Sequence, residues 1–147
     1  MNAPVSHTLV TALRAVPSFA SVDERTLLTL IGDSANLFWP PGAVVFERGS
    51  PADGLYIILS GSVRILDGSG TQVAVLGPGD FFGEFSLLLG TIHQHDVFVG
   101  DSAELMVVPK ESIDELMASN PELGRSIRLK AEERMAANAR SAASTPS

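Results

Sequence analysis

The chain has 147 residues, of which 45% are hydrophobic, and a formal net charge of −7 at pH 7. This length favours a single domain with a real hydrophobic core, and no apolar run approaches the ~20 residues that a membrane-spanning helix needs. The negative charge opposes binding to the phosphate backbone of nucleic acids. The sequence contains no cysteine, which is compatible with a reducing cytosol. We therefore expect a cytoplasmic protein that binds neither membranes nor nucleic acids.

Residues 6–32 contain two short amphipathic patterns, which predict a helical lead-in to the domain. The first pattern ends before Pro17, because a residue that precedes proline is disfavoured in a helix. Ser21 and Glu24 have the spacing of a capping box, so we expect Ser21 to cap the second helix.

Residues 38–109 consist of short β-rich runs separated by turn residues. Two alternating runs, 62–66 and 72–76, flank the turn sequence Asp-Gly-Ser-Gly at 67–70 and predict a hairpin. Short strands at this spacing are typical of a mainly β fold, an eight-stranded antiparallel β-roll or jelly-roll barrel. Residues 84–89 alone within this region predict a helix, of one to two turns, between two strands.

Residues 110–140 are expected to form the C-terminal helices, and Asn120-Pro121 has the composition of a helix start. The last helix carries a narrow apolar stripe at i+4 spacing, formed by Leu123, Ile127, Ala131 and Met135. We expect this stripe to fold over the β-roll as a lid or to pair with a second chain or a protein partner. Residues 141–147 are small and polar and predict a disordered tail, which leaves 1–140 as the single domain.

The charge along the last helix differs from that of the whole chain. Residues 121–140 carry a net charge of +2, because they contain more basic than acidic side chains. The basic residues are Arg125, Arg128, Lys130, Arg134 and Arg140, and the acidic residues are Glu122, Glu132 and Glu133. We interpret these charges as a solvated helix face.

Three separate blocks of the sequence resemble one known family. They are residues 13–19 (LRAVPSF), residues 41–49 with 55–63 (PGAVVFERG and LYIILSGSV), and residues 79–88 (GDFFGEFSLL). In this order they resemble the cyclic nucleotide-binding domain family, in particular the sensor domains of CRP-like regulators and of protein kinase A regulatory subunits. The resemblance spans roughly residues 9–120. It implies a β-roll with a phosphate-binding cassette and a regulatory, non-enzymatic role without catalytic residues.

The resemblance implies a ligand site at the third block. Gly83 and Glu84 would open the short cassette helix, followed by Phe85 and Ser86. Backbone N–H groups at a helix start attract an anion, here the cyclic phosphate. The carboxylate of Glu84 would accept a hydrogen bond from the ribose 2′-hydroxyl.

The position that the family gives to a phosphate-binding arginine falls on His93, and the next position is Gln94. Arginine forms two charge-assisted hydrogen bonds to a phosphate, whereas a neutral histidine offers one donor. Losing one charge-assisted bond lowers affinity by ~10- to 150-fold. We therefore expect weak or altered binding of a cyclic nucleotide, cAMP or cGMP, and no other cofactor.

Two alternatives follow from the same residues. The chain could be a ligand-free module of this fold that dimerises or docks a partner through its C-terminal helix. It could also be a cupin-like metal-binding protein, because His93 and His95 point the same way in an extended strand, with Glu84 or Glu104 as a further ligand.

Overall fold

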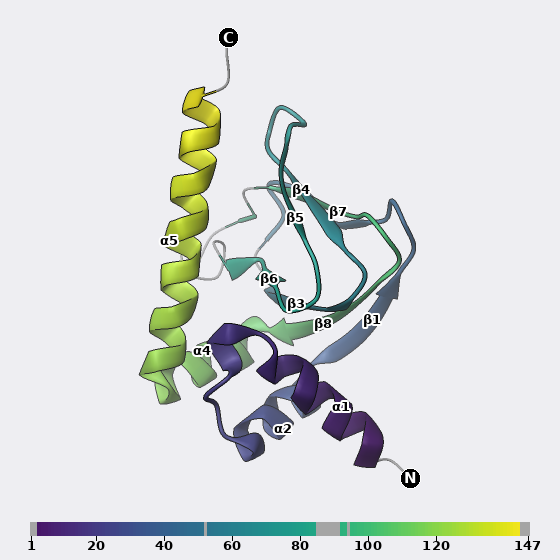
Figure 1. Cartoon of the computed structure of the whole chain (residues 1–147), viewed down its shortest axis with the longest axis vertical. Helices are drawn as coiled ribbons and strands as arrows, with labels where there is room; N and C mark the ends of the chain where they lie inside the picture. The colour runs from purple at the N-terminus through teal and green to yellow at the C-terminus, as the bar shows by residue number, and fades with distance from the viewer. Residues whose placement is uncertain (1–2, 52, 85–91, 94, 145–147) are drawn as a thin grey trace.

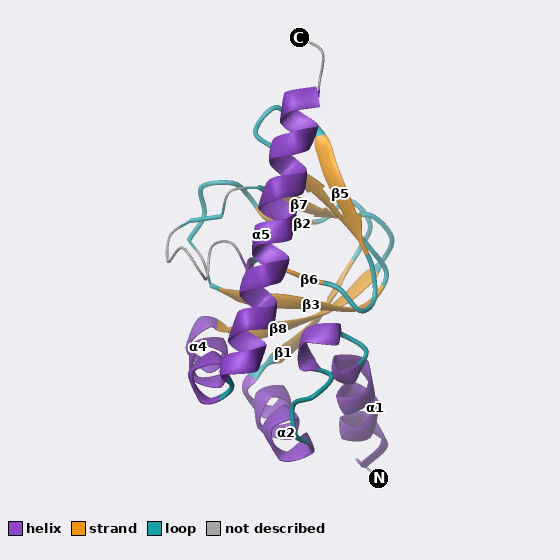
Figure 2. Cartoon of the chain, turned by 60° about the vertical axis from the view of Figure 1, so that its left-hand side comes forward, coloured by secondary structure: helices purple, strands orange, loops and turns teal. Residues whose placement is uncertain are grey.

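A computed structural model describes residues 3–51, 53–84, 92–93 and 95–144. The molecule has three layers, in which a group of helices covers one face of a two-sheet β-roll (Figures 1 and 2). The long C-terminal helix runs along one side of the roll, and the N-terminal helices lie below it in Figure 1.

The described strands form two antiparallel sheets of four, in the orders β1-β8-β3-β6 and β2-β7-β4-β5. This arrangement confirms the predicted mainly β fold with an antiparallel β-roll. The strands are β1 (Ala35–Trp39), β2 (Val44–Phe46), β3 (Gly54–Ser60), β4 (Val63–Leu66), β5 (Gln72–Leu76), β6 (Phe81–Phe82), β7 (Asp96–Val99) and β8 (Ala103–Pro109).

The helices that cover the first sheet are α1 (Ala3–Arg14), the short 3-10 helix η1 (Pro17–Phe19), α2 (Glu24–Asp33), α4 (Lys110–Ser119) and α5 (Pro121–Ser144). The expected cap at Ser21 is wrong, because α2 begins two residues later and the carboxylate of Asp23 accepts a hydrogen bond from the Thr26 backbone N–H at 3.1 Å. The expected tail at 141–147 is also too long, since α5 continues through Ser144.

Strand β3 is hydrophobic along nearly its whole length because both of its faces are buried. Leu55 and Ile57 pack against the helices, whereas Tyr56 and Ile58 point into the interior of the roll. Successive residues of a strand face opposite sides, so β3 belongs to two cores at once. It thereby fixes the helical layer on the roll.

Strand β6 repeats this pattern at the edge of the same sheet. Phe81 belongs to the helix-side core and Phe82 to the interior of the roll. Leu123 and Ile127 of α5 join the helix-side core, and Ala131 is also buried. Three residues of the expected apolar stripe therefore lie against this chain's own elements, while the side chain of Met135 is outside what the structure describes.

The turn between β3 and β4 depends on glycine at position 61. Gly61 has φ +80°, and an added Cβ would collide with the carbonyl oxygen of Ser102. Gly70, in the next turn, has φ +84° but no heavy atom within 4 Å of an added Cβ. The two positions therefore share a strained backbone conformation and differ in the space around it.

We predict that Gly61→Ala lowers the free energy of unfolding by about 2–5 kcal/mol, from backbone strain and overpacking together. Gly70→Ala should lower it by only about 1–2 kcal/mol, from strain alone. Urea denaturation of both variants measures the difference, and equal losses would contradict the packing of this turn against Ser102.

Candidate functional site

The site begins at Gly83, where the chain leaves β6. Gly83 has φ +90°, and an added Cβ would lie 3.0 Å from the carbonyl oxygen of Gly54 and 3.3 Å from the Tyr56 ring. Both the conformation and the space therefore favour glycine at this position. Glu84 follows this turn directly and has a helical conformation.

Glu84 is a buried carboxylate, with 2% of its surface exposed. Its Oε2 accepts a hydrogen bond from Nη1 of Arg134 at 2.6 Å. Arg134 lies on α5, 50 residues further along the chain. A buried carboxylate is strongly disfavoured unless it is paired, so this ion pair explains how Glu84 is accommodated inside the protein.

Two further features define the surroundings of Arg134. The guanidinium carbon lies 5.1 Å from the centroid of the Phe81 ring, a cation–π geometry. The second terminal nitrogen, Nη2, is buried and has no hydrogen-bond partner within the described part of the chain. A buried donor without a partner costs about 1–3 kcal/mol. The guanidinium is therefore held in place while one of its donor groups stays unused.

The residue at the expected arginine position lies inside the roll. The His93 ring is 1% exposed and stacks on Phe46, with the ring centroids 3.6 Å apart. Its Nε2 lies 3.3 Å from the Asp53 carboxylate, and its backbone exchanges hydrogen bonds with Ser50 and Gly49. Burial lowers the pKa of His93 below its usual value, although Asp53 acts in the opposite direction. The imidazole is therefore mostly neutral at pH 7.

Asp53 joins His93 to a second buried side chain. The Tyr56 hydroxyl donates a hydrogen bond to Asp53 Oδ2 at 2.9 Å. Burial raises the pKa of the Tyr56 phenol, and the nearby carboxylate raises it further. The aromatic rings of Phe46, Tyr56 and Phe82 also pack together. His93 thus lies within an aromatic cluster inside the β-roll.

Several predicted site residues lie outside the described part of the chain. These are Phe85, Ser86 and Gln94, together with the expected helix at 84–89 beyond its first residue. Close to this segment, Oδ1 of Asp96, the first residue of β7, accepts a hydrogen bond from the Arg48 backbone N–H at 2.8 Å. Asp96 therefore joins strand β7 to the end of β2.

The metal-binding alternative receives no support from the described residues. Among them, no group of three His, Cys, Asp or Glu side chains could hold a metal ion. His93 is directed at Asp53, and Glu84 is paired with Arg134. Glu104 accepts a hydrogen bond from the Asn36 side chain at 2.9 Å, so it has a partner of its own.

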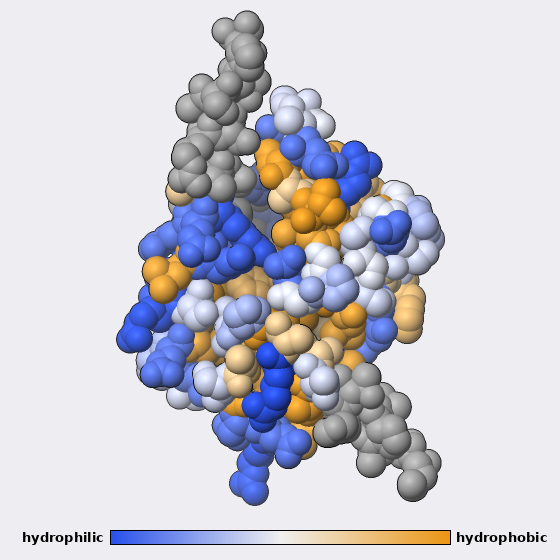
Figure 3. All heavy atoms as spheres, viewed as in Figure 1, coloured by the Kyte–Doolittle hydropathy of each residue, from blue (hydrophilic) through white to orange (hydrophobic). Residues whose placement is uncertain are grey.

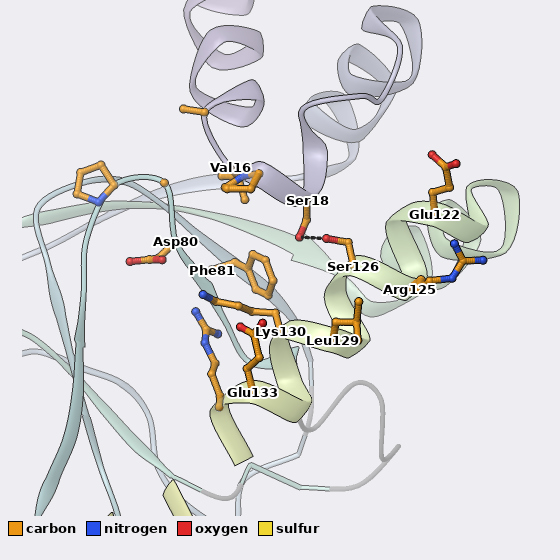
Figure 4. A pocket seen from close by; sticks show the side chains of 15 residues that line it. Val16, Ser18, Asp80, Phe81, Glu122, Arg125, Ser126, Leu129, Lys130 and Glu133 are labelled. Carbon is orange, nitrogen blue, oxygen red and sulfur yellow. Dashed lines mark hydrogen bonds between the residues drawn. The ribbon is translucent and has the colours of Figure 1, made fainter. Parts of the chain in front are cut away.

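A cavity of about 670 Å³ lies beside the ion pair, between α5, η1 and the loop that leads to β6 (Figure 4). Ser18 and Ser126 form a 2.7 Å hydrogen bond at its wall. Phe81 and Arg134 line this cavity as well. Arg134 therefore contacts Glu84 on one side and the cavity on the other. On the visible face of the molecule, hydrophilic side chains predominate on the coloured, lower part of α5 (Figure 3).

Arg134 is the site residue that sequence reasoning missed, because we interpreted the charges of 121–140 as a solvated face. The spacing of residues along the helix nevertheless indicated that Arg134 lies near the buried face. Arg134 follows Ala131 by three residues, so both lie on the same side of the helix. Ala131 belongs to the apolar stripe and is 3% exposed, which places Arg134 at the border of the buried face.

A β-roll whose glycine–glutamate turn meets a C-terminal helix defines a class of regulatory ligand-binding domain. Residues 37–120 match the family model described as the cyclic nucleotide-binding domain, which is more than half of the chain. The chain therefore belongs to the cyclic nucleotide-binding domain family, and the resemblance seen in the sequence is confirmed.

The curated relatives are longer proteins with different activities. A cyclic nucleotide-gated potassium channel of Mesorhizobium japonicum is 30% identical over 125 residues, which cover 85% of this chain and 34% of the channel. A CRP-like cAMP-activated global transcriptional regulator of Mycobacterium tuberculosis is 37% identical over 73 residues, or 47% of this chain and 33% of the regulator. The chain thus spans about a third of these relatives. No helix among its described residues is long and apolar enough to cross a membrane.

Solved structures confirm the fold. The cAMP-bound PfPKA-R fragment has a TM-score of 0.82 at 15% identity, covering 92% of this chain and 46% of that chain. The sensor domain of the transcriptional regulator DNR from Pseudomonas aeruginosa has a TM-score of 0.78 at 20% identity and covers 92% of both chains. At these identities the likeness concerns the fold alone.

Two histidines predict how stability depends on pH, of which His93 is buried and His95 is partly buried. Burial lowers the pKa of both His93 and His95 in the folded state, so the unfolded chain binds protons first as the pH falls below about 6.5. This stabilising contribution is complete above pH 6.5 and is lost as the pH falls through the folded-state values. We predict that the free energy of unfolding decreases between pH 7.5 and 5.5.

Urea denaturation at pH 7.5, 6.5 and 5.5 measures this slope. His93→Gln should remove part of it and His95→Gln another part, because each variant removes one imidazole whose pKa is lowered in the folded state. A wild-type protein whose stability does not change over this range would show that folding lowers the pKa of neither imidazole.

Proposed function

We propose that this chain is a regulatory sensor domain that binds a cyclic nucleotide weakly. The observation that carries the proposal is Glu84, a carboxylate that is 2% exposed and lies directly after the strained turn at Gly83. Nothing in the packing of apolar side chains requires a carboxylate at this buried position. A ligand hydroxyl, such as the ribose 2′-hydroxyl of a cyclic nucleotide, is a suitable hydrogen-bond donor for it.

The affinity should be low because His93 is a poor substitute for a phosphate-binding arginine. Its ring is stacked on Phe46, its Nε2 is near Asp53, and burial lowers its pKa. A neutral imidazole brings no positive charge to a phosphate and offers one donor at most, in place of the two donors of an arginine fork. We expect a dissociation constant on the order of 10 µM or weaker for cAMP and cGMP.

The output of such a sensor would involve α5. The Glu84 carboxylate contacts Arg134 of this helix, so a ligand that binds to Glu84 also changes the surroundings of the helix. The relatives differ in the activity that accompanies the domain, since one is a channel, another a transcriptional regulator and a third a glutaminase. We propose that α5 transmits binding to a neighbouring segment or to a protein partner.

Calorimetric titration with cAMP, cGMP and 2′-deoxy-cAMP tests the proposal. We predict that the wild-type protein binds the deoxy analogue about 5- to 10-fold more weakly than cAMP, because the hydrogen bond to Glu84 is lost. Glu84→Gln should reduce this discrimination. The matched control Glu132→Gln changes an exposed carboxylate of α5 and should preserve it.

A submicromolar affinity for cAMP would contradict the weak-binding part of the proposal. No binding of any of the three compounds at millimolar concentration would contradict the sensor function and favour a ligand-free module of the same fold.

A further inference from the structure

We propose that strand β1 is an interaction surface and that its partner is the β1 strand of a second copy of this chain. The two strands would pair in antiparallel orientation about a twofold axis at Leu37, which would join one sheet of each copy into a continuous sheet. Strand β6, which leads to Glu84, lies at the opposite edge of the same sheet. The inference therefore concerns a surface away from the ligand site and does not depend on nucleotide binding.

Strand β1 has an open edge. It is hydrogen-bonded to β8 on one side, and none of the described strands pairs with its other side. Figure 1 shows β1 on the side of the roll away from α5. The pairing with β8 is regular from Ala35 to Trp39, so the backbone is straight enough to accept another strand. An edge of this kind presents a row of unpaired N–H and C=O groups that can bind a second strand.

The other described edge strands have features that oppose such pairing. Edges are commonly protected by short length, bulges, charged side chains or proline. Strand β6 has only two residues, and the pairings of β2 and β5 with their neighbours each contain an irregularity. Strand β1 has five residues in regular register and contains neither a charged side chain nor a proline. Among the described edges, β1 is therefore the one best suited to pairing.

The exposed apolar side chains of β1 lie on both faces of the strand. Phe38 is 78% exposed, the highest fraction among the large apolar side chains that the structure describes, and Leu37 is 42% exposed. Successive residues of a strand point to opposite faces, so the two side chains need cover on opposite sides. A partner that rests on one face of the sheet would cover only one of them. A strand paired along the edge places side chains beside both.

The sequence of β1 is complementary to itself in this register. With Leu37 opposite its own copy, Phe38 lies opposite Asn36 and Trp39 lies opposite Ala35. Each aromatic side chain thus meets a smaller one at the distance of a cross-strand pair, where side chains interact directly. A cavity of about 400 Å³, lined in part by Phe38 and Trp39, adjoins this end of the strand and leaves room for the second copy. This match favours a second copy as the partner.

The charges permit a dimer but make it weak. Each copy has a net charge of −7, so two copies repel each other. The pairing brings no two charged side chains of β1 together. Glu104, which is in register with Phe38 on β8, would lie ~15 Å from its copy, because three strand spacings separate them. This separation exceeds the Debye length of about 8 Å at physiological salt. For so small an interface we expect a dissociation constant on the order of 100 µM, which should decrease as the salt concentration rises.

Disulfide cross-linking tests the pairing and its register. The chain contains no cysteine, so a cross-link reports the introduced position alone. Residues directly opposite in an antiparallel pair have Cα atoms about 4.5–5.5 Å apart, which suits a disulfide. Leu37→Cys should therefore form a linked dimer at least ~10-fold faster than Val75→Cys. Val75 is the matched control, because it is 56% exposed on the edge strand β5.

A mixture of two further variants reports the register. Asn36→Cys and Phe38→Cys should cross-link to each other, because these positions face one another across the twofold axis. Each variant alone should cross-link more slowly, since its own copy lies on the diagonal, where Cα atoms are more than about 7 Å apart. Intact mass spectrometry, with one of the two variants tagged, separates the mixed product from the two symmetric ones.

Sedimentation equilibrium without nucleotide measures the dimer itself. The wild-type protein should change from monomer to dimer between about 10 µM and 1 mM, with a parallel change in the fluorescence of Trp39, the single tryptophan of the chain. Phe38→Lys replaces an exposed side chain, so it should fold and raise the dissociation constant at least ~10-fold through lost apolar burial and added charge. Val75→Lys, the control with the same charge, should leave the dissociation constant unchanged.

Two results would overturn the inference. One is a wild-type protein that stays monomeric at 1 mM. The other is a dimer that Phe38→Lys does not weaken and in which Leu37→Cys cross-links no faster than Val75→Cys, because its interface would then lie elsewhere on the molecule. Since every measurement is made without nucleotide, neither result bears on the proposed sensor function.

Discussion

The ion pair between Glu84 and Arg134 is the polar contact that joins α5 to the edge of the β-roll. Most of that boundary consists of apolar side chains from β3, β6 and α5, which bury surface without specifying a direction. The Glu84 carboxylate, which is 2% exposed, does specify a direction, because a buried carboxylate needs a cation at hydrogen-bond distance. Arg134 fulfils this requirement from α5, so the helix has one favoured position along the edge of the roll.

The same contact joins the carboxylate of the glycine–glutamate turn to the C-terminal helix. In this chain the expected arginine position is occupied by a histidine that is stacked on Phe46 and takes part in the interior of the roll. The positive charge next to the cassette comes from α5 instead. The carboxylate and the cation therefore belong to two different layers of the molecule, the β-roll and the helices.

The fold could be predicted from the sequence because its signals are local. Alternating runs, turn sequences and three motif blocks indicated the β-roll, and the apolar stripe of Leu123 and Ile127 indicated a buried helix face. The site could be predicted only in part. Gly83 and Glu84 stand within one motif, whereas Arg134 is 50 residues away from Glu84, and its charge resembled that of a solvated face. Likewise, the stacking of His93 on Phe46 depends on how strand β2 meets a segment that lies far from it in the sequence, which no local pattern reports. The Ser21 cap failed because Asp23, two residues later, competes for the same helix start.

The most direct test of this account is a double-mutant cycle on the ion pair, with Glu84→Gln, Arg134→Gln and the double variant compared by urea unfolding without ligand. If the pair holds α5 on the roll, each single variant leaves a buried group without its partner. The double variant is then more stable than the sum of the two losses predicts, with a coupling energy of at least about 1 kcal/mol. Losses that add to within about 0.5 kcal/mol would show that the two side chains do not interact and would contradict the account.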